Sequence, residues 1–300
     1  MLAGISRTGY YRHPSANPRR LDTLLRDRIQ SIATLKNRNY GYRRIQVVLQ
    51  KEGWIINHKR VLRLMRDDNL LCLRRKAFVP VTTNSKHEWR VWPNLARGIQ
   101  TTAINQLWVS DITYIRLLEE FVFLAVILDA HSRRVIGWSL KTHLSASVAI
   151  EALNMALGCR NPEPGLIHHS DRGVQYACSD YTSLLLDRGI QISMSRIGNP
   201  YDNAKAESFM KTLKYDQLYA ESFRDLKQLR RSLHQFIENV YNTQRLHSAL
   251  SYCSPQEFEQ NCGKPEQLVL NPLMLGKRAA APFPRPHSPL KPGMDNLNCP

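Results

Sequence analysis

One short segment restricts the fold of this 300-residue chain more than any other: the apolar run from Phe121 to Leu128. Asp129 ends the run after eight residues, whereas a membrane-spanning helix needs about 18 or more. A strand with no polar face must be covered on both sides, so we expect this run to be a central strand of a sheet. The chain also lacks a secretory hydrophobic segment at its N-terminus, so we expect a cytoplasmic protein.

The segments around this run alternate between strand-like and helix-like patterns. Clusters of β-branched and apolar residues predict five strands, at about 107–115, 121–128, 134–140, 166–168 and 191–195. Apolar residues that recur about every 3.6 positions predict helices at 145–157, around 181–186, from about 203 onward, and at 222–245. Ser145 is a candidate N-cap for the first of these helices. The alternation indicates an α/β domain.

The first third of the chain has a different character, because it is basic and shows only helical patterns. Residues 1–100 contain 21 Lys and Arg against 6 Asp and Glu, which accounts for +15 of the net charge of +17. Three short helices are predicted at 21–37, 42–51 and 58–68, the last with Asn57 as N-cap. One side of the third helix carries four basic residues, Lys59, Arg60, Arg63 and Arg66. This pattern favours DNA binding by a helix-turn-helix, although a bundle with a solvated basic face would look the same.

Three acidic residues stand in distinctive surroundings within the α/β part. Asp111 lies inside the first predicted strand, Asp171 follows the fourth, and Glu207 lies near the start of the helix after residue 203. Carboxylates from three separate elements suit two Mg²⁺ or Mn²⁺ ions that stabilise the attacking and leaving oxygens of a phosphoryl transfer. The alternative is three unrelated solvated side chains. Asp129, at the end of the apolar run, is interpreted as a turn residue.

The sequence around each of these acids resembles a known signature. The three passages are Trp108–Tyr114 (WVSDITY), His169–Tyr176 (HSDRGVQY) and Asp202–Phe209 (DNAKAESF). They resemble the integrase catalytic core of retroviral integrases and bacterial transposases, and above all the second-reading-frame (OrfB-type) transposases of the insertion-sequence-three family. The 35 residues between Asp171 and Glu207 match the Asp-Asp-Glu spacing of that family. The resemblance covers about residues 5–260 and is highly specific.

The resemblance implies a fold and an activity. The fold would be a ribonuclease-H-like core with a mixed five-stranded sheet, in which the first strand is central and the fourth lies beside it. A small all-α helix-turn-helix domain would precede it. The activity would be cleavage at element ends and strand transfer, with Asp111, Asp171 and Glu207 as ligands of two Mg²⁺ (or Mn²⁺) ions. Lys211 and Lys214 lie on the same helical face as Glu207 and would contact DNA phosphates; related transposases carry a basic residue at the Lys214 position.

The family also implies partners and a location. Partners would be the terminal repeats and target DNA, further copies of the chain on that DNA, and a first-reading-frame product joined by frameshifting. The place of action would be the bacterial nucleoid. One departure stands out: related chains usually have Pro before His247, where this chain has Leu246.

The same patterns suggest boundaries for the parts of the chain. We expect an N-terminal segment at 1–20, a helix-turn-helix domain at 21–73, a linker at 74–103, the catalytic core at 104–261 and a Pro-rich, disordered tail at 262–300. In the linker, docking on the core is the favoured role for Trp89 and Trp92. The six cysteines contain no Cys-x-x-Cys pair, so we expect neither a disulfide framework nor a zinc site.

Two other functions remain open at this point. A ribonuclease of the same fold would need the same carboxylates, but it would not need a basic helical domain. A DNA-binding regulator, or the inactive remnant of a transposase, would keep that domain without turnover. Metal-dependent nicking of terminal-repeat DNA would separate the three functions.

Overall fold

A computed structural model describes residues 18–36, 39–71, 89–118, 120–196, 199–219 and 221–262. Most of the expected N-terminal segment, half of the expected linker and nearly all of the Pro-rich tail therefore lie outside the described residues. None of the helices within these ranges combines the length and apolar character that crossing a bilayer requires.

The core is built on one mixed sheet of five strands. The strands are β1 (Leu107–Arg116), β2 (Phe121–Asp129), β3 (Val135–Lys141), β4 (Ile167–Ser170) and β5 (Gln191–Met194). Their order is β3-β2-β1-β4-β5, with β2 antiparallel to β1 and β3, and with β4 parallel to β1 and β5. The apolar run forms β2, which is bonded on both edges and almost wholly buried, as expected. The expected central position of β1 and its pairing with β4 are confirmed.

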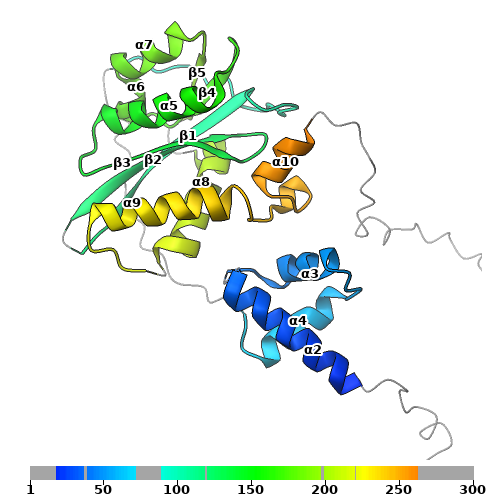
Figure 1. Cartoon of the computed structure of the whole chain (residues 1–300). Helices are drawn as coiled ribbons and strands as arrows, with labels where there is room; N and C mark the ends of the chain where they lie inside the picture. The colour runs from blue at the N-terminus through cyan, green and yellow to red at the C-terminus, as the bar shows by residue number, and fades with distance from the viewer. Residues whose placement is uncertain are drawn as a thin grey trace, which may run out of the picture. The chain divides into compact units, whose positions relative to one another are not determined.

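Helices cover both faces of this sheet, so the core has three layers (Figure 1). One face carries α5 (Ala146–Arg160), α6 (Val174–Ala177) and α7 (Ser179–Asp187). The other face carries α8 (Ala204–Leu213), η3 (Lys214–Leu218), α9 (Leu226–His234) and η4 (Gln235–Tyr241). Short helices η2 (Pro200–Asn203), η5 (Ser248–Leu250) and α10 (Pro255–Asn261) complete it.

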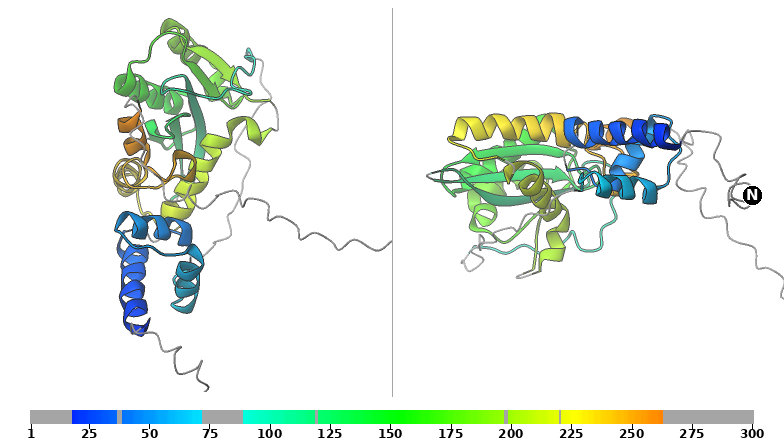
Figure 2. Two further views of the ribbon diagram at one scale, coloured as in Figure 1. Left: turned by 90° about the vertical axis from the view of Figure 1, so that its right-hand side faces the viewer. Right: turned by 90° about the horizontal axis from the view of Figure 1, so that it is seen from below.

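The helices depart from the sequence expectations in three details. Ser145 occupies the N-cap position of α5, but its hydroxyl bonds that of Ser147, so the expected side-chain cap is wrong. The helix expected at 222–245 begins only at Leu226, because the Asp225 carboxylate caps it by accepting from the Gln228 N–H. From Gln235 that helix continues in the wider π form, seen as one long rod in Figure 2. The switch to π geometry leaves no signature in the sequence that we can name.

The basic N-terminal third forms a small helical bundle. Its elements are α2 (Pro18–Ser31), η1 (Ile32–Lys36), α3 (Tyr42–Lys51) and α4 (His58–Asp67). Asn57 caps α4 as expected, since its side-chain oxygen accepts from the Lys59 N–H at 2.8 Å. Their buried apolar side chains form one cluster, which includes Leu25, Ile29, Ile45, Leu49, Val61, Leu64 and Met65.

Leu246 joins the apolar cluster of this bundle. Its N–H donates to the Tyr40 hydroxyl at 3.1 Å, and that hydroxyl donates to the Gln244 carbonyl at 3.0 Å. Arg44 donates to the Leu246 carbonyl. A proline at position 246 would have no N–H and could not donate the first of these bonds.

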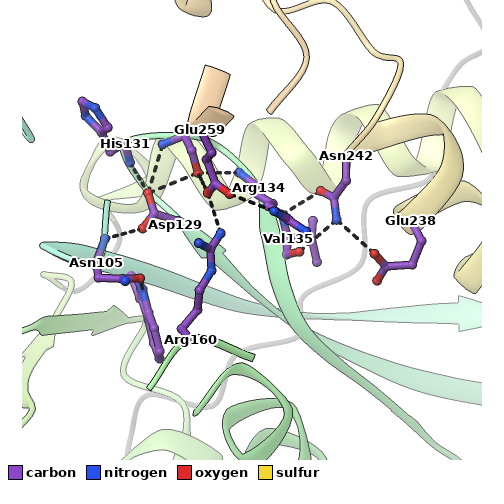
Figure 3. Close-up of polar contacts among 11 residues, drawn as sticks. Asn105, Asp129, His131, Arg134, Val135, Arg160, Glu238, Asn242 and Glu259 are labelled. Atoms are coloured by element: carbon purple, nitrogen blue, oxygen red, sulfur yellow. Dashed lines mark hydrogen bonds and ion pairs between the residues drawn. The ribbon is translucent and has the colours of Figure 1, made fainter. Parts of the chain in front are cut away.

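Asp129 is the most buried acidic side chain of the sheet, and its role is structural (Figure 3). Its carboxylate accepts from the backbone N–H groups of Asn105, His131 and Ser132 at 2.6–3.0 Å. These bonds fix the turn between β2 and β3, which confirms that Asp129 is a turn residue.

Glu259 of α10 ties three elements together in the same region (Figure 3). It accepts from Ser132 at 2.6 Å, from Arg134 at 2.8 Å, and from Arg160 at the end of α5. Burial alone would raise the pKa of Glu259. The hydrogen bonds from these three donors lower it by more than burial raises it, so the net shift is downward. The ionised carboxylate therefore stabilises the folded state.

Glu259→Gln should destabilise the protein at neutral pH by about 3 kcal/mol, because two partly buried cations lose their charged partner. Since the folded-state pKa is lowered, the contribution is complete above the ordinary Glu value of 4.5 and is lost as the pH falls through the folded-state pKa. Urea unfolding of parent and variant, from neutral pH to below the folded-state pKa, measures the difference in their free energy of unfolding. Glu163→Gln, an exposed change of the same charge, is the control. An equal loss in both variants, or a gap that does not narrow on acidification, would contradict the assigned role.

Candidate active site

The three candidate carboxylates come from neighbouring elements. Asp111 lies in β1 opposite Val126 of β2, and Asp171 directly follows β4. The last β1–β4 pair is Val109 with His169; two residues further along each strand stand Asp111 and Asp171. The two parallel strands thus bring both acids to one level of the sheet. Glu207 is exposed in the first turn of α8, the helix that packs on β1.

The electrostatics show that two of these carboxylates act on the third, Asp111. Burial is the main cause that raises the pKa of Asp111 to about 7, followed by the negative charge of Asp171 and, more weakly, that of Glu207. Burial also raises the pKa of Glu207. Carboxylates that repel each other out of water are stabilised by a cation. In the described ranges, however, no three or more His, Cys, Asp or Glu side chains are already arranged to hold a metal ion.

Asp171 sits in a tight turn that explains the glycine two residues later. Its Oδ1 accepts from the Gly173 N–H at 2.9 Å. A Cβ atom added to Gly173 would lie 3.0 Å from the same oxygen and 3.1 Å from the Gln175 side chain. A larger residue would therefore press on the carboxylate. Arg172, between them, donates to the Ser195 carbonyl at 2.6 Å and fastens the turn to the end of β5.

The two histidines before Asp171 are structural. His168 is bonded to the Tyr181 hydroxyl at 3.0 Å, and His169 uses both ring nitrogens on Ser193 and Ser195. Burial lowers the pKa of His168 to about 3 and that of His169 to about 4, so both rings are neutral. They hold β4 in place and add no positive charge beside the carboxylates.

Asn203 is a functional candidate that the sequence reasoning did not assign. Its buried side-chain amide donates to the Ser110 carbonyl at 2.8 Å. Ser110 directly precedes Asp111, and Asn203 itself lies four residues before Glu207. Its Oδ1 is buried with no hydrogen-bond partner in the described part of the chain. Only the position of Asn203, four residues before Glu207, could have pointed to it.

The two lysines expected beside Glu207 differ in their surroundings. Lys211 is exposed on α8. Lys214 is half-buried, and its Nζ lies 5.4 Å from the centre of the Tyr114 ring. Burial lowers the pKa of Lys214, and the nearby Asp111 charge opposes that shift. Lys214 therefore faces the carboxylate region, whereas Lys211 has no partner among the residues that the structure describes.

The four basic residues expected on the third helix of the bundle are all exposed on α4. One of them, Arg60, is paired with Asp22 of α2. Its hydrogen bond is the main cause that lowers the pKa of Asp22, and Arg63 contributes by its charge. Arg60 must therefore share its charge between Asp22 and any phosphate, which the sequence pattern could not reveal.

Family models match two parts of the chain. The integrase core domain matches residues 101–200, and a second integrase core model matches residues 188–255. An HTH-like domain matches residues 20–78.

Solved structures show a weaker likeness. The simian T-cell lymphotropic virus intasome is 17% identical with a TM-score of 0.45, covering 82% of this chain and 76% of that chain. The HTLV-2 integrase catalytic core domain is 17% identical with a TM-score of 0.39, covering 52% of this chain and 95% of that chain. The family of the chain is therefore assigned from its relatives in sequence.

Those relatives match over most of their length. A 31 kDa protein of insertion element IS600 from Shigella sonnei is 37% identical over 86% of this chain and 96% of its own. The transposase of IS904 from Lactococcus lactis is 39% identical over 79% of this chain and 94% of its own length. Transposase InsF of IS3A from Escherichia coli is 37% identical over 75% and 78%. With these relatives and with the matches to the integrase core and HTH-like domains, the chain belongs to the IS3 family of insertion-element transposases.

Proposed function

We propose that this transposase cuts DNA at the ends of its insertion element and joins the freed 3′ ends to new DNA, using Asp111, Asp171 and Glu207. The observation that carries the proposal is the convergence of the other two carboxylates on Asp111. Burial is the main cause that raises the pKa of Asp111, and the charges of Asp171 and Glu207 add to it, although the three residues come from β1, the turn after β4, and α8. Side chains from distant parts of a sequence that converge in this way are typical of a catalytic site.

The donor set fits two divalent cations, Mg²⁺ or Mn²⁺, because it offers hard carboxylate oxygens and leaves room for water and phosphate. When bound, these cations would lower the pKa of an attacking water or 3′-hydroxyl and neutralise charge on the phosphate. The three carboxylates would serve as ligands. His168 and His169, neutral and engaged elsewhere, would leave the site to oxygen ligands.

The other residues of the site would position its parts. Lys214 combines partial burial with a place beside Asp111, so its ammonium can hold a DNA phosphate next to the carboxylates. Lys211, exposed one turn after Glu207, would contact the backbone further out. Asn203 joins the start of α8 to β1 and would hold Glu207 at the correct height over Asp111.

The N-terminal bundle would bind the element ends, with Lys59, Arg63 and Arg66 on phosphates and Arg60 in a weaker role. Two ends must be cut and joined together, so we expect several copies of the chain on DNA, with a first-reading-frame product as a further partner. The site of action would be the bacterial nucleoid. A regulator or an inactive remnant would bind the same ends without cutting them.

Asp111→Asn, Asp171→Asn and Glu207→Gln should each reduce end cleavage and strand transfer to background, because each removes a charged ligand from the site. Binding of a terminal-repeat duplex without metal should stay near that of the parent. Gel assays of nicking and joining, with Mg²⁺ and with Mn²⁺, measure the first effect. Asp187→Asn, which changes an exposed carboxylate of α7, is the control. Near-normal joining by one of the three variants would remove that residue from the site.

The basic face of α4 should show in the salt dependence of DNA binding. Lys59→Ala, Arg63→Ala and Arg66→Ala should each make the slope of log affinity against log salt shallower by about 0.9, measured between about 50 and 200 mM salt. Arg60→Ala should change it less, because Asp22 already engages that guanidinium. Fluorescence anisotropy on a terminal-repeat duplex gives the slopes, with Arg188→Ala as an exposed control on the core. Unchanged slopes in all four variants would make the bundle structural.

The positioning role of Asn203 predicts a defect in the use of metal. Asn203→Ala should raise the Mg²⁺ concentration for half-maximal cleavage by about tenfold or more, because it frees α8 from β1 beside the ligands. Affinity for end DNA without metal should change little. Asn239→Ala, which removes an exposed side-chain bond from η4, is the matched control. If Asn203→Ala lowered only thermal stability and left the Mg²⁺ titration unchanged, Asn203 would be a structural residue alone.

A further inference from the structure

A cavity of about 350 Å³ lies beside the candidate active site, and the catalytic proposal does not use it. It is formed where the β1–β2 hairpin meets η3. Its lining is mainly aromatic or basic, and two aliphatic side chains complete it: Tyr114, Phe121, Tyr219, Arg116 and Lys214, with Ile115 and Leu218. Ligand pockets span about 300–1,000 Å³, so this one has room for a single small planar group rather than a length of double helix.

Flat rings and positive charges alternate along the wall. The Tyr114 and Phe121 ring centres are 5.8 Å apart at 65°. The Lys214 Nζ lies 5.4 Å from the centre of the Tyr114 ring, and the Arg116 guanidinium carbon lies 5.9 Å from that of Phe121. The exposed fraction of Phe121 is 49%, a large apolar surface to leave in water. A cavity lined by aromatic rings, with cations over two of them, fits an aromatic group attached to an anion, which is the chemistry of a nucleotide.

The polar groups of the cavity suit the same ligand. Burial, and then the neighbouring Tyr219 phenol, raise the pKa of Tyr114. Burial likewise raises the pKa of Tyr219. Both hydroxyls therefore remain protonated at neutral pH and can donate to the edge of a base or to a phosphate oxygen.

Lys214 connects this cavity to the reaction. It lines the cavity, and its pKa also responds to the charge of Asp111. A strand with its reacting phosphate at the carboxylates would therefore pass Lys214, and the next nucleotide would reach the cavity. A base in the cavity must leave the stacked double helix and give up its base pair. Stacking on the aromatic side chains offsets the free energy lost in this way.

We propose that this cavity holds one unpaired base of the element end, next to the phosphate that is cut. The proposal rests on the proposed function. Tyr114, Phe121 and Tyr219 form the stacking surfaces, and Lys214 and Arg116 hold the flanking backbone. The ligand is a single DNA base; a side chain from a second copy of the chain is the other occupant that the test can reveal.

The test uses the full chain and a terminal duplex taken from the DNA that flanks the reading frame. 2-Aminopurine is placed at successive positions around the cut, and its fluorescence is followed without metal, so that the result does not depend on catalysis. We expect a rise at one position only. Tyr219→Ala should abolish it and Tyr219→Phe should keep it. Tyr215→Ala is the matched control, since Tyr215 packs on Tyr219 at 5.5 Å but does not line the cavity.

Cleavage with Mg²⁺ provides the second arm. Tyr219→Ala should cut a fully paired end about tenfold more slowly, the scale of one base–aromatic stack. A mismatch at the reporting position should restore part of this loss, because the base is already unpaired. An abasic nucleotide at that position should bring the parent down to the rate of the variant.

The outcomes separate the two proposals. Two outcomes would contradict the proposed base-binding cavity without affecting the proposed transposase mechanism. In the first, the parent binds and cuts the end without any rise in fluorescence. In the second, Tyr219→Ala and Tyr215→Ala behave alike. A defect of Tyr219→Ala in multimer formation alone, seen by sedimentation, would assign the cavity to a second copy. A parent that binds the end but never cuts or joins it would instead contradict the proposed function, whatever the fluorescence shows.

Discussion

Like charges repel most strongly where water is excluded, and Asp111 lies in such a place with two further acids close to it. Asp111 is held between sheet and helix, close enough to Asp171 and Glu207 for their charges to raise its pKa. Much of the nearby structure serves to keep these groups in position. The β1–β4 register sets two of them level, the glycine turn fixes Asp171, and the Asn203 amide anchors the helix that carries Glu207.

Buried carboxylates elsewhere in the core show how the same chemical group acquires a different role. Asp129 and Glu259 are enclosed by hydrogen-bond donors: backbone N–H groups for the first, a hydroxyl and two guanidinium groups for the second. Asp111 accepts one backbone bond, from Ile112. An acid whose charge is satisfied by the protein stabilises the fold, whereas an acid left short of donors keeps an affinity for cations.

The sequence predicted the features that depend on local pattern. The apolar run anticipated the interior position of β2, and the Asn57 cap and the spacing of the acids were readable along the chain. Features that depend on contacts between distant segments were not readable. These include the bond from Asn203 to β1, the clasp of Glu259 on the β2–β3 turn, and the ion pair of Arg60 with Asp22. The family resemblance supplied the roles of the acids; the sequence pattern alone left them among ordinary surface carboxylates.

The short length of β4 has a further consequence. Its pairing with β1 stops at Val109 and His169, while β1 continues to Arg116, so the second half of β1 has no neighbouring strand on that side in the described part of the chain. Such a free edge invites another strand to add to it, which leads to aggregation. Here the Asn203 amide occupies the Ser110 carbonyl at the start of the free edge, and α8 packs on β1. The second half of β1 can thus stay open to a ligand on this side without pairing with a strand from another molecule.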